Sequence, residues 1–369
     1  MQRIKLLYFT NIPSPYRIDF FNMLGEHVDL TVLFERKDAD DRDSIWMSIE
    51  DKILNFSPVF LKGIKIGQDS AISIEALKYW RDKQYDIRIV GDYATPTGIL
   101  SVLYMQLLHI EYDIECDGGF VRDSEGKIKR TIKNTLLKKT RYAYSPGELT
   151  DKYLINYGLL PQHIIRYHFS SITENDIRCA REARKNRELY RNKFGLYGKK
   201  VVLFVGQIIQ RKGVDLLIKS ASLLSDEFII LVVGGELTNA YKEIIEQYNV
   251  TNVTFLGFKQ KEEIREYYAA ADLFFLPTRE DIWGLVIAEA MSYGLPVVTT
   301  DKCVAGVELL NNQKYAIVCS ENYKQMAESI QTIMRDYWID YGRQNFKIAQ
   351  SYTIEQMTKD HLSSFERKQ

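Results

Sequence analysis

The first half of the chain alternates short apolar runs with longer segments of helical spacing. Ser73–Lys83 and Gly98–His109 show the helical pattern. Short apolar runs bounded by turn residues are typical of parallel strands that are buried on both faces of a sheet. We therefore expect strands and helices to alternate in a doubly wound α/β domain. The strands that this pattern predicts are Ile4–Thr10, Leu30–Phe34, Ile87–Val90, Arg141–Tyr144 and Ile164–His168.

A second alternating series follows a highly charged, apolar-poor stretch between Ser170 and Lys200, which is typical of an exposed helix and linker. We therefore expect an α/β fold with two Rossmann-like, doubly wound domains facing across a cleft, residues 1–170 and 171–351. The final helical pattern, Tyr352–Phe365, caps the second domain or crosses back to pack on the first. The strands predicted for the second domain are Val201–Val205, Phe228–Val233, Val253–Leu256, Leu273–Leu276 and Pro296–Thr300.

Composition limits the class of protein. The chain has 369 residues with 49 basic and 49 acidic side chains, so its net charge indicates no nucleic-acid partner. The longest apolar stretch, Gly98–Ile110, is too short to span a bilayer, and the N-terminal residues lack the apolar segment of a signal peptide. We expect a cytoplasmic protein with reduced thiols, because no CxxC or metal-ligand spacing connects the cysteines Cys116, Cys179, Cys303 and Cys319.

Residues 278–298, TREDIWGLVIAEAMSYGLPVV, combine several features of a ligand site. Leu273–Leu276 predicts a strand, and the loop after it leads through Gly284 into a helix. That helix is expected to run to about Tyr293, with Gly294 as its C′ residue. In an open α/β sheet, ligands bind at the carboxyl ends of the strands. The loop and the helix start are therefore candidate ligand contacts.

The start of this helix favours a phosphate. Free N–H groups at Gly284, Leu285 and Val286 suit an anion, and the glycine lets a ligand approach the backbone closely. Asp281 and Glu289, eight positions apart, would repel phosphate, so sugar hydroxyls are their natural targets. The combination predicts a site for a sugar joined to a diphosphate. Taken as an isolated acidic pair, the two residues are better explained as a helix cap and a solvated side chain.

A second loop carries adjacent cations. After the strand Val201–Val205, the chain passes Gly206 and reaches Arg211, Lys212 and Gly213. Two cations at the carboxyl end of a strand suit a pyrophosphate and stabilise its charge when a bond to it breaks. Such turns are also common on protein surfaces. Neither GxxxxGK[ST] nor GxGxxG is present, so ATPase and dinucleotide-binding functions lose support.

Together these motifs resemble the retaining glycosyltransferases of family 4, which have the GT-B fold. The resemblance covers most of the C-terminal half in order and spacing, whereas the N-terminal half matches only in its alternating pattern. It implies a donor-binding C-terminal domain and an acceptor-binding N-terminal domain. The motifs that carry it are Gly206…Arg211-Lys212-Gly213, Gly234-Gly235, Phe255-Leu-Gly257 and Asp281-x-Trp-Gly284…Glu289-Ala-Met-x-x-Gly294-x-Pro296.

The resemblance also implies roles for the two acids. The family has two glutamates with seven residues between them. Counting back from Glu289 places the first at Asp281, with Glu280 as the alternative one position away. In the family, the first acid lies near the donor sugar and the second holds the ribose hydroxyls. The resemblance therefore assigns Asp281 to the sugar and Glu289 to the ribose.

For the cations, Lys212 matches the family's phosphate-binding lysine. Gln207 stands where the family usually has an arginine, and Arg211 is the candidate replacement. The loop at Gly257-Phe258 resembles the region whose backbone receives the nucleotide base. The other residues expected at the donor are Gly206, Ile282, Trp283, Gly284, Leu285 and Val286.

The acceptor is expected at strand ends of the N-terminal domain. Tyr16 and Arg17 stand in a proline-containing loop where the family often has a glycine-rich one. Arg17 either reaches the donor phosphate or lies on the surface. Asp92 and the turn at Asp117-Gly118-Gly119 are further candidates, and their alternative role is to stabilise turns through Asx-type hydrogen bonds.

Histidines and acidic pairs bear on the mechanism. Inverting enzymes of this fold need a general base, often a histidine. No histidine here sits in a glycine-rich or proline-rich loop, so we interpret all five as structural, which agrees with a retaining reaction. Asp38-Ala-Asp40 and Asp41-Arg-Asp43 resemble a metal-binding DxD, but a solvated turn explains them better, and we expect no metal and no cofactor. The histidines are His27, His109, His163, His168 and His361.

The segment Lys127–Arg141 contains seven basic residues and no acid. Ile128, Ile132 and Leu136 recur every fourth residue, as on one face of a helix. Such a helix suits an anionic membrane surface, where it would bring the enzyme to a lipid-linked acceptor. The alternative is a solvated basic helix whose apolar face packs on its own domain.

The sequence thus predicts a retaining glycosyltransferase that uses a nucleotide-sugar donor. A UDP-sugar is favoured over a GDP-sugar. The acceptor would be a glycan or lipid-linked saccharide in cell-surface polysaccharide assembly, with the enzyme peripheral on the inner face of the membrane. Two alternatives remain. One is a nucleotide-sugar epimerase or phosphorylase on the same fold, and the other is a non-catalytic protein that binds sugar nucleotides.

Overall fold

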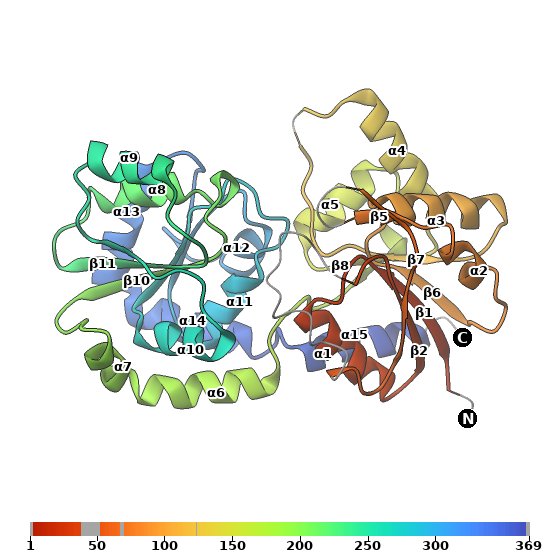
Figure 1. Ribbon diagram of the computed structural model, residues 1–369, viewed down its shortest axis with the longest axis horizontal. Helices are drawn as coiled ribbons and strands as arrows, with labels where there is room; N and C mark the ends of the chain where they lie inside the picture. The colour runs from red at the N-terminus through yellow and green to blue at the C-terminus, as the bar shows by residue number, and fades with distance from the viewer. Residues whose placement is uncertain (1–2, 38–51, 67–69, 123, 367–369) are drawn as a thin grey trace. The chain divides into compact units, whose positions relative to one another are not determined.

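The computed structural model describes residues 3–37, 52–66, 70–122 and 124–366. The chain divides into two compact units. Unit 1 comprises residues 1–170 and 354–369, and unit 2 comprises residues 171–353. Figure 1 shows both units, coloured along the chain. The acidic pairs of residues 38–43, interpreted above as a solvated turn, lie outside the described residues.

Unit 1 is built on a seven-stranded parallel sheet in the order β3-β2-β1-β6-β7-β8-β9. A small antiparallel hairpin, β4 and β5, stands apart from it. Because chain order runs outward from β1 in both directions, the order reverses between β1 and β6. The strands are β1 (Lys5–Thr10), β2 (Asp29–Phe34), β3 (Ser57–Phe60), β4 (Ile64–Ile66), β5 (Ser70–Ile72), β6 (Ile87–Val90), β7 (Asp113–Glu115), β8 (Ala143–Ser145) and β9 (Ile164–Arg166).

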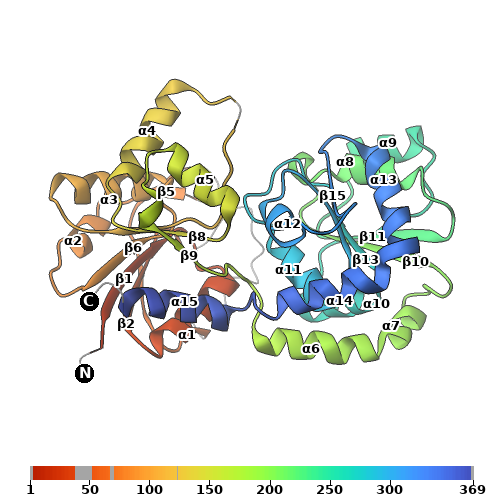
Figure 2. The same ribbon diagram turned by 180° about the vertical axis from the view of Figure 1, so that it is seen from behind.

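Helices cover both faces of this sheet. Figures 1 and 2 show α1 and α15 on one face and α2 to α5 on the other. Local sequence sets their starts: Thr95 accepts a hydrogen bond from the Gly98 N–H at 3.1 Å, and Pro96 then begins α3. The helices are α1 (Pro15–Gly25), α2 (Ala76–Trp80), α3 (Pro96–Leu107), α4 (Lys127–Lys138), α5 (Glu148–Asn156) and α15 (Ile354–Glu366).

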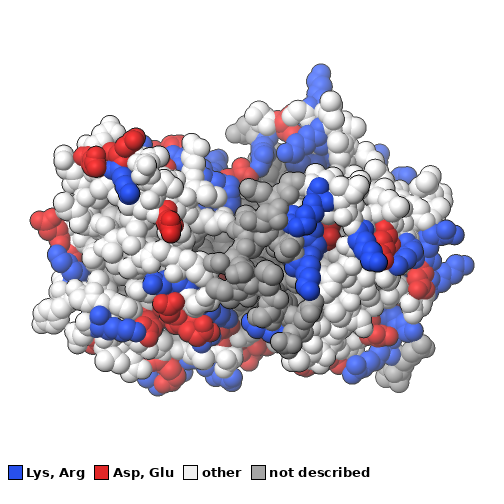
Figure 3. Space-filling model, viewed as in Figure 1, with Lys and Arg blue, Asp and Glu red and all other residues white. Residues whose placement is uncertain are grey.

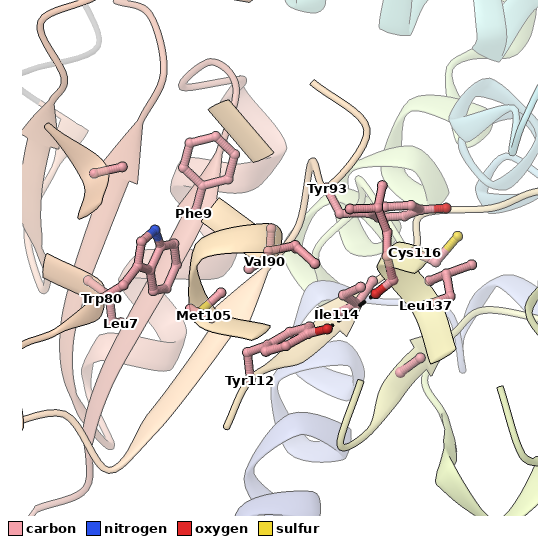
Figure 4. Packing of buried hydrophobic residues seen from close by; sticks show 14 of the residues in the cluster. Leu7, Phe9, Trp80, Val90, Tyr93, Met105, Tyr112, Ile114, Cys116 and Leu137 are labelled. Carbon is pink, nitrogen blue, oxygen red and sulfur yellow. Dashed lines mark hydrogen bonds between the residues drawn. The ribbon is translucent and has the colours of Figure 1, made fainter. Parts of the chain in front are cut away.

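The core of unit 1 lies between the sheet and the α2–α5 layer. Figure 4 shows Leu7 and Phe9 of β1 packed with Val90 of β6 and with Trp80 and Met105 of the helices. Alternate residues of β1 point to the other face, where Tyr8 meets Phe21 of α1 at 4.9 Å between ring centroids. Burial on both faces explains why β1 is a continuous apolar run.

Unit 2 repeats this architecture with a six-stranded parallel sheet in the order β12-β11-β10-β13-β14-β15. Its strand order is the doubly wound 3-2-1-4-5-6 pattern. The strands are β10 (Lys200–Val205), β11 (Phe228–Val233), β12 (Val253–Phe255), β13 (Leu273–Leu276), β14 (Val297–Thr300) and β15 (Ile317–Val318). The prediction of a doubly wound α/β fold with two Rossmann-like sheets is confirmed.

Helices also flank the sheet of unit 2. In Figure 1, α8, α9 and α13 lie on one side of the sheet, and α10 and α14 lie on the other with α6 and α7. The helices are α6 (Glu174–Lys185), α7 (Arg187–Lys193), α8 (Val214–Ala221), α9 (Asn239–Gln247), α10 (Lys261–Ala270), α11 (Leu285–Ser292), α12 (Val304–Leu309), α13 (Tyr323–Thr332) and α14 (Trp338–Ala349).

The last helix, α15, belongs to unit 1 although it follows unit 2 in the chain. It packs along α1, and Figure 2 shows the two helices side by side. Of the two alternatives for the C-terminal segment, packing on the first domain is therefore the one observed. The Ser364 and Tyr144 hydroxyls, 2.6 Å apart, tie the helix to β8.

Three local expectations need correction. The helix expected at Ser73–Lys83 is shorter, since Ser73 follows β5 and its backbone N–H donates to the Thr97 hydroxyl at 3.0 Å. The strand expected at Arg141–Tyr144 spans Ala143–Ser145 instead, because its pairing begins where Ala143 lies opposite Ile114 of β7. Five short strands were not anticipated, namely β3, β4, β5, β7 and β15.

We expect Phe9→Ala to lower the free energy of unfolding by about 3–5 kcal/mol, because a fully buried ring leaves a cavity in the core. Leu107→Ala is the matched control, since Leu107 is 75% exposed and its loss should cost under about 0.5 kcal/mol. Urea unfolding midpoints measure both. Equal midpoint shifts for the two variants would contradict this description of the core.

Candidate functional site

The first candidate site lies where the strand order of unit 2 reverses. β10 and β13 are paired at the centre of the sheet, with Val202 opposite Leu273. Their connections leave in opposite directions, and in open α/β sheets this point, beyond the carboxyl ends of the strands, is where ligands bind. The loops that leave them, residues 206–213 and 277–284, carry most of the residues that the sequence predicted at the donor.

Arg279 ties these two loops together. Its guanidinium donates to both carboxylate oxygens of Asp215 at 2.7 and 2.8 Å and to the Gln210 carbonyl at 2.8 Å. Its backbone N–H donates to the Arg211 carbonyl at 2.8 Å, and the Thr278 hydroxyl donates to the same carbonyl at 3.0 Å. Partial burial would raise the pKa of Asp215, but its hydrogen bonds to Arg279 lower that pKa instead.

The two residues expected to act on phosphate and on sugar are in direct contact. Lys212 Nζ lies 2.5 Å from Asp281 Oδ2, and both side chains are largely buried. The Asp281 backbone is fixed as well, because its N–H donates to the Lys302 carbonyl at 2.9 Å. Of the two acids considered for this position, Asp281 makes this ion pair, while the Glu280 carbonyl accepts a hydrogen bond from Arg211 at 2.9 Å.

Gly284 is the N-cap residue of α11 and lies in the left-handed region, with φ at +99°. A Cβ there would lie 2.7 Å from Cys303 Sγ, so the position requires glycine on conformational and steric grounds. The amides of Leu285 and Val286 follow in the first turn, where a helix has no internal acceptor for them. Gly294 has φ at +67° after the last turn, which confirms it as the C′ residue.

Glu289 is held one helical turn further on. Its carboxylate accepts hydrogen bonds from the Ser171 hydroxyl at 3.2 Å and the Tyr268 hydroxyl at 3.3 Å. The Tyr268 ring stacks on Tyr293 with centroids 5.1 Å apart, which fixes its direction. Burial raises the pKa of Glu289, and the two hydroxyls partly offset that effect. The arrangement presents an oriented hydrogen-bond acceptor.

The remaining residues predicted at the donor surround these two loops. Gln207 is exposed just beyond β10, and Gly257 lies beyond β12 with φ at +70°. The Gly257 carbonyl accepts from the Gly234 N–H at 3.0 Å, which brings the ends of β11 and β12 together. Phe258 and Ile282 are 52% and 53% exposed.

Gly206 and Trp283 contribute through their backbones. The Gly206 N–H donates to the Val233 carbonyl at 2.9 Å, and a Cβ on Gly234 would lie 1.9 Å from the Gly206 oxygen. The Trp283 side chain is buried, and its carbonyl accepts from the Ala305 N–H at 2.8 Å. These contacts fix the backbone positions of Gly206 and Trp283 in the two loops.

In unit 1, Arg17 does not lie on the surface, and that alternative is wrong. The side chain is 2% exposed, because Glu115 and Asp117 supply the compensating charges at 2.5 Å each. The Tyr8 hydroxyl accepts a further hydrogen bond from Arg17 Nη1 at 3.1 Å. The guanidinium also lies 5.6 Å from the Tyr16 ring centroid.

The two aspartates expected at the acceptor stand at the ends of neighbouring strands. Asp92 follows β6, and its Oδ2 accepts from the Thr10 hydroxyl at 2.7 Å and the Asn11 N–H at 2.9 Å. These contacts join the loop after β6 to the end of β1 and differ from the local Asx-type turn given above as the alternative. Asp117 follows β7, and Gly118 after it has φ at +149°. Burial raises the pKa of Asp117 to about 7, although Arg17 opposes that shift.

Sequence reasoning missed three residues that organise these sites. Arg279 connects the two loops of unit 2. Glu115 and His361 lie behind Arg17 in unit 1, and His361 Nε2 is 2.8 Å from Glu115 Oε2. Glu115 and His361 are 246 positions apart. The sequence carries no local signal for such a pair, because their contact depends on where α15 folds.

Within the described residues, no group of three or more histidine, cysteine, aspartate or glutamate side chains is arranged to hold a metal ion. The expectation that no metal is needed stays a prediction. The same residues include no helix with the length and apolarity needed to cross a membrane.

Residues 186–349 match a protein-family model described as glycosyl transferases group 1. Mannosylfructose-phosphate synthase of Agrobacterium fabrum is 34% identical over 171 residues, which are 43% of this chain and 37% of that protein. The lipopolysaccharide glucosyltransferase WaaG of Escherichia coli is 33% identical over 134 residues, 35% of each chain. The matched regions thus span less than half the length of these relatives.

Similarity of structure extends over nearly the whole chain. Anabaena Alr3699/HepE, solved in complex with UDP, gives a TM-score of 0.78 at 15% identity and covers 99% of this chain and all of its own. The crystal structure of WaaG gives 0.67 at 15% identity, covering 97% of this chain and 99% of its own. At these identities the likeness shows the fold, which is that of the GT-B glycosyltransferases.

We expect Gly213→Ala to lower the free energy of unfolding by about 3 kcal/mol and to weaken nucleotide binding. Gly213 has φ at +72°, and a Cβ would lie 1.9 Å from the Pro277 carbonyl, so the two loops would move apart. Gly195→Ala is the control, because its φ is +67° but nothing lies within 4 Å. That variant should lose only about 1 kcal/mol.

Chemical denaturation and calorimetric titration with nucleoside diphosphates measure the two effects. If Gly213→Ala binds nucleotide as well as Gly195→Ala does, the close approach of the loops is irrelevant to the site.

Proposed function

We propose that this chain, whose residues 186–349 match the glycosyl transferases group 1 model, moves a sugar from a nucleotide diphosphate donor to a glycan or lipid-linked saccharide and retains the anomeric configuration. The observation that carries the proposal is the contact between Lys212 and Asp281 at the point where the strand order reverses. A cation for phosphate and an acceptor for sugar hydroxyls stand together beside the open N-terminal end of α11.

In this proposal the donor diphosphate replaces Asp281 as the partner of Lys212. Arg211 and the amides at Gly284 and Leu285 add positive potential around the phosphates. Release from Lys212 frees the Asp281 carboxylate to accept hydrogen bonds from the sugar. Glu289, already oriented by Ser171 and Tyr268, accepts them from the ribose.

Uridine is the base we propose. One observation on a similar protein supports it: Alr3699/HepE was solved with UDP and with UDP-glucose. The exposed ring of Phe258 beside Gly257 offers a surface on which a base can stack.

In the reaction, the bond between the sugar C1 and the phosphate oxygen breaks, and its electron pair leaves with the diphosphate. Lys212, Arg211 and the α11 amides stabilise the charge that develops there. The acceptor hydroxyl forms the new bond on the same face, and its proton passes to the leaving phosphate oxygen. The resemblance to retaining enzymes of family 4 supports this course.

We propose that unit 1 takes the acceptor at the carboxyl ends of β6 and β7. Asp92 and Asp117 stand there, each with one oxygen held by the protein, and both are partly exposed. Their free oxygens suit the hydroxyls of a saccharide. Arg17 orients Asp117 from beneath and stays charged, because it is paired with two carboxylates.

The geometry of α4 supports a membrane-bound acceptor. Leu136 and Leu137 are buried against unit 1, but Ile128 and Ile132 are 80% and 43% exposed, so the apolar stripe does not pack wholly on its own domain. Figure 3 shows basic side chains projecting over this part of unit 1. Exposed isoleucines among lysines and arginines fit an anionic lipid surface.

To test the donor site, we expect Lys212→Ala to lower kcat by about a hundredfold, because it removes a cation that stabilises the leaving phosphate. Glu289→Gln should raise the Kd for a UDP-sugar about tenfold. Lys242→Ala, an exposed cation on α9, is the control and should change neither. Product analysis and calorimetry measure transfer and binding separately.

Other outcomes of this test would favour the alternatives. Binding without turnover for any saccharide acceptor would indicate a non-catalytic binding protein. Conversion of the donor sugar in the absence of acceptor would indicate an epimerase.

To test the membrane proposal, we expect the double variant Ile128→Ser, Ile132→Ser to bind vesicles containing phosphatidylglycerol at least about fivefold less tightly. Ile339→Ser in unit 2 is the control, since Ile339 is 57% exposed but lies outside α4. Raising the salt concentration should weaken the remaining binding, because it screens the basic residues. Cosedimentation measures the bound fraction, and equal binding by wild type and the double variant would exclude α4.

A further inference from the structure

A histidine of α15 is buried in unit 1 in a form that carries charge. His361 is fully buried, with Nδ1 2.8 Å from the Met357 carbonyl and Nε2 2.8 Å from Glu115 Oε2. A carbonyl oxygen only accepts hydrogen bonds, so Nδ1 carries a proton. A carboxylate also only accepts, so Nε2 carries a second proton. The two contacts together describe an imidazolium paired with Glu115.

This pair continues toward the end of β7. Glu115 Oε1 accepts from Arg17 Nη1 at 2.5 Å, and Arg17 Nη2 donates to Asp117 Oδ1 at 2.5 Å. Burial would raise the pKa of Glu115, but Arg17 and His361 lower it to about 2. Two cations and two carboxylates therefore alternate along one path, from α15 to the loop where Asp117 stands.

Rigid neighbours hold the path in place. The His361 ring stacks on Tyr144 with centroids 4.4 Å apart, and the Arg17 guanidinium lies 5.6 Å from the Phe169 ring centroid. Arg17, Glu115 and His361 are at most 2% exposed, whereas the Asp117 side chain is 24% exposed. Asp117 is thus the end of the path that a ligand can reach.

We propose that His361 is a positioning residue for the acceptor, acting through Glu115 and Arg17 on the Asp117 carboxylate. This inference rests on the proposed function, because it takes Asp117 to contact the acceptor. Arg17 has to serve two carboxylates at once. His361 neutralises the far oxygen of Glu115, so the guanidinium keeps its second nitrogen on Asp117 and leaves the other Asp117 oxygen directed at the acceptor.

Without the imidazolium, Arg17 would be the remaining cation beside Glu115, with the Tyr8 hydroxyl as a neutral partner. In a low-dielectric interior the guanidinium would then shift toward Glu115, and Asp117 would lose its orientation. Donor binding should not change, because the donor residues belong to unit 2. The expected signature is therefore a loss confined to the acceptor.

The experiment compares His361→Gln with Ser364→Ala. The glutamine amide can still donate to Glu115 but carries no charge. Ser364 is also buried on α15 and anchors the same helix through Tyr144; its hydroxyl donates to the backbone carbonyl of His361 at 2.7 Å, so the variant perturbs the same turn of α15 while leaving the four charged side chains in place. We expect His361→Gln to lower kcat/KM for the acceptor at least about tenfold, with the Kd for the UDP-sugar within about twofold of wild type. Ser364→Ala should leave both values near wild type.

A double-variant cycle with Asp117→Asn then tests the route. If His361 acts through Asp117, adding His361→Gln to Asp117→Asn should cause little further loss. Glu115→Gln interrupts the same path and serves as a second probe if His361→Gln does not fold. Equal acceptor losses in His361→Gln and Ser364→Ala, or full additivity in the cycle, would overturn the inference.

Failure of the proposed function looks different from failure of this inference. A wild-type protein that binds UDP-sugar but transfers it to no acceptor would refute the function, and the inference with it. Normal transfer by wild type together with an unaffected Asp117→Asn variant would refute only the inference.

Discussion

The direction of parallel strands is the constraint on which the rest of the structure depends. In a parallel sheet every strand ends at the same edge, so the loops that follow the strands gather there. In unit 2 this brings Lys212 and Asp281, which are 69 positions apart, within one ion pair. In unit 1 the same rule places Asp92 and Asp117 at the ends of adjacent strands. One architecture thus gathers two different groups of side chains, a lysine–aspartate pair in unit 2 and two aspartates in unit 1.

The orientation of the charged side chains in both units is set by their ion-pair partners. A buried ion is costly unless partners satisfy it, and removing one partner leaves the other uncompensated. Arg279 joins two loops because it bridges Asp215 and a carbonyl of the neighbouring loop. Arg17 plays the corresponding part in unit 1, between Glu115 and Asp117. Each arginine thus fixes the direction of a carboxylate and the position of the loop beside it.

The sequence predicted the structural features that depend on local or repeating residue patterns. Strands such as β10 and β13 are apolar on both faces, so their pattern alone located them, and glycines such as Gly294 marked the helix ends. β15 has two residues, too few for any periodicity to appear. Arg17 was ambiguous because the burial of a charge depends on partners about 100 positions away. His361 was interpreted as merely structural, since nothing near it in the sequence points to Glu115.

The crossing of α15 into unit 1 has a consequence for the order in which the protein is made. Synthesis proceeds from the N-terminus, so β1 to β9 emerge from the ribosome before any residue of unit 2. Glu115 then lacks its histidine, and the face of the sheet beside α1 stays uncovered until residues 354–366 have been translated. Unit 1 therefore cannot complete its interior until unit 2 has been translated, and a chain released early would expose apolar surface to chaperones and proteases.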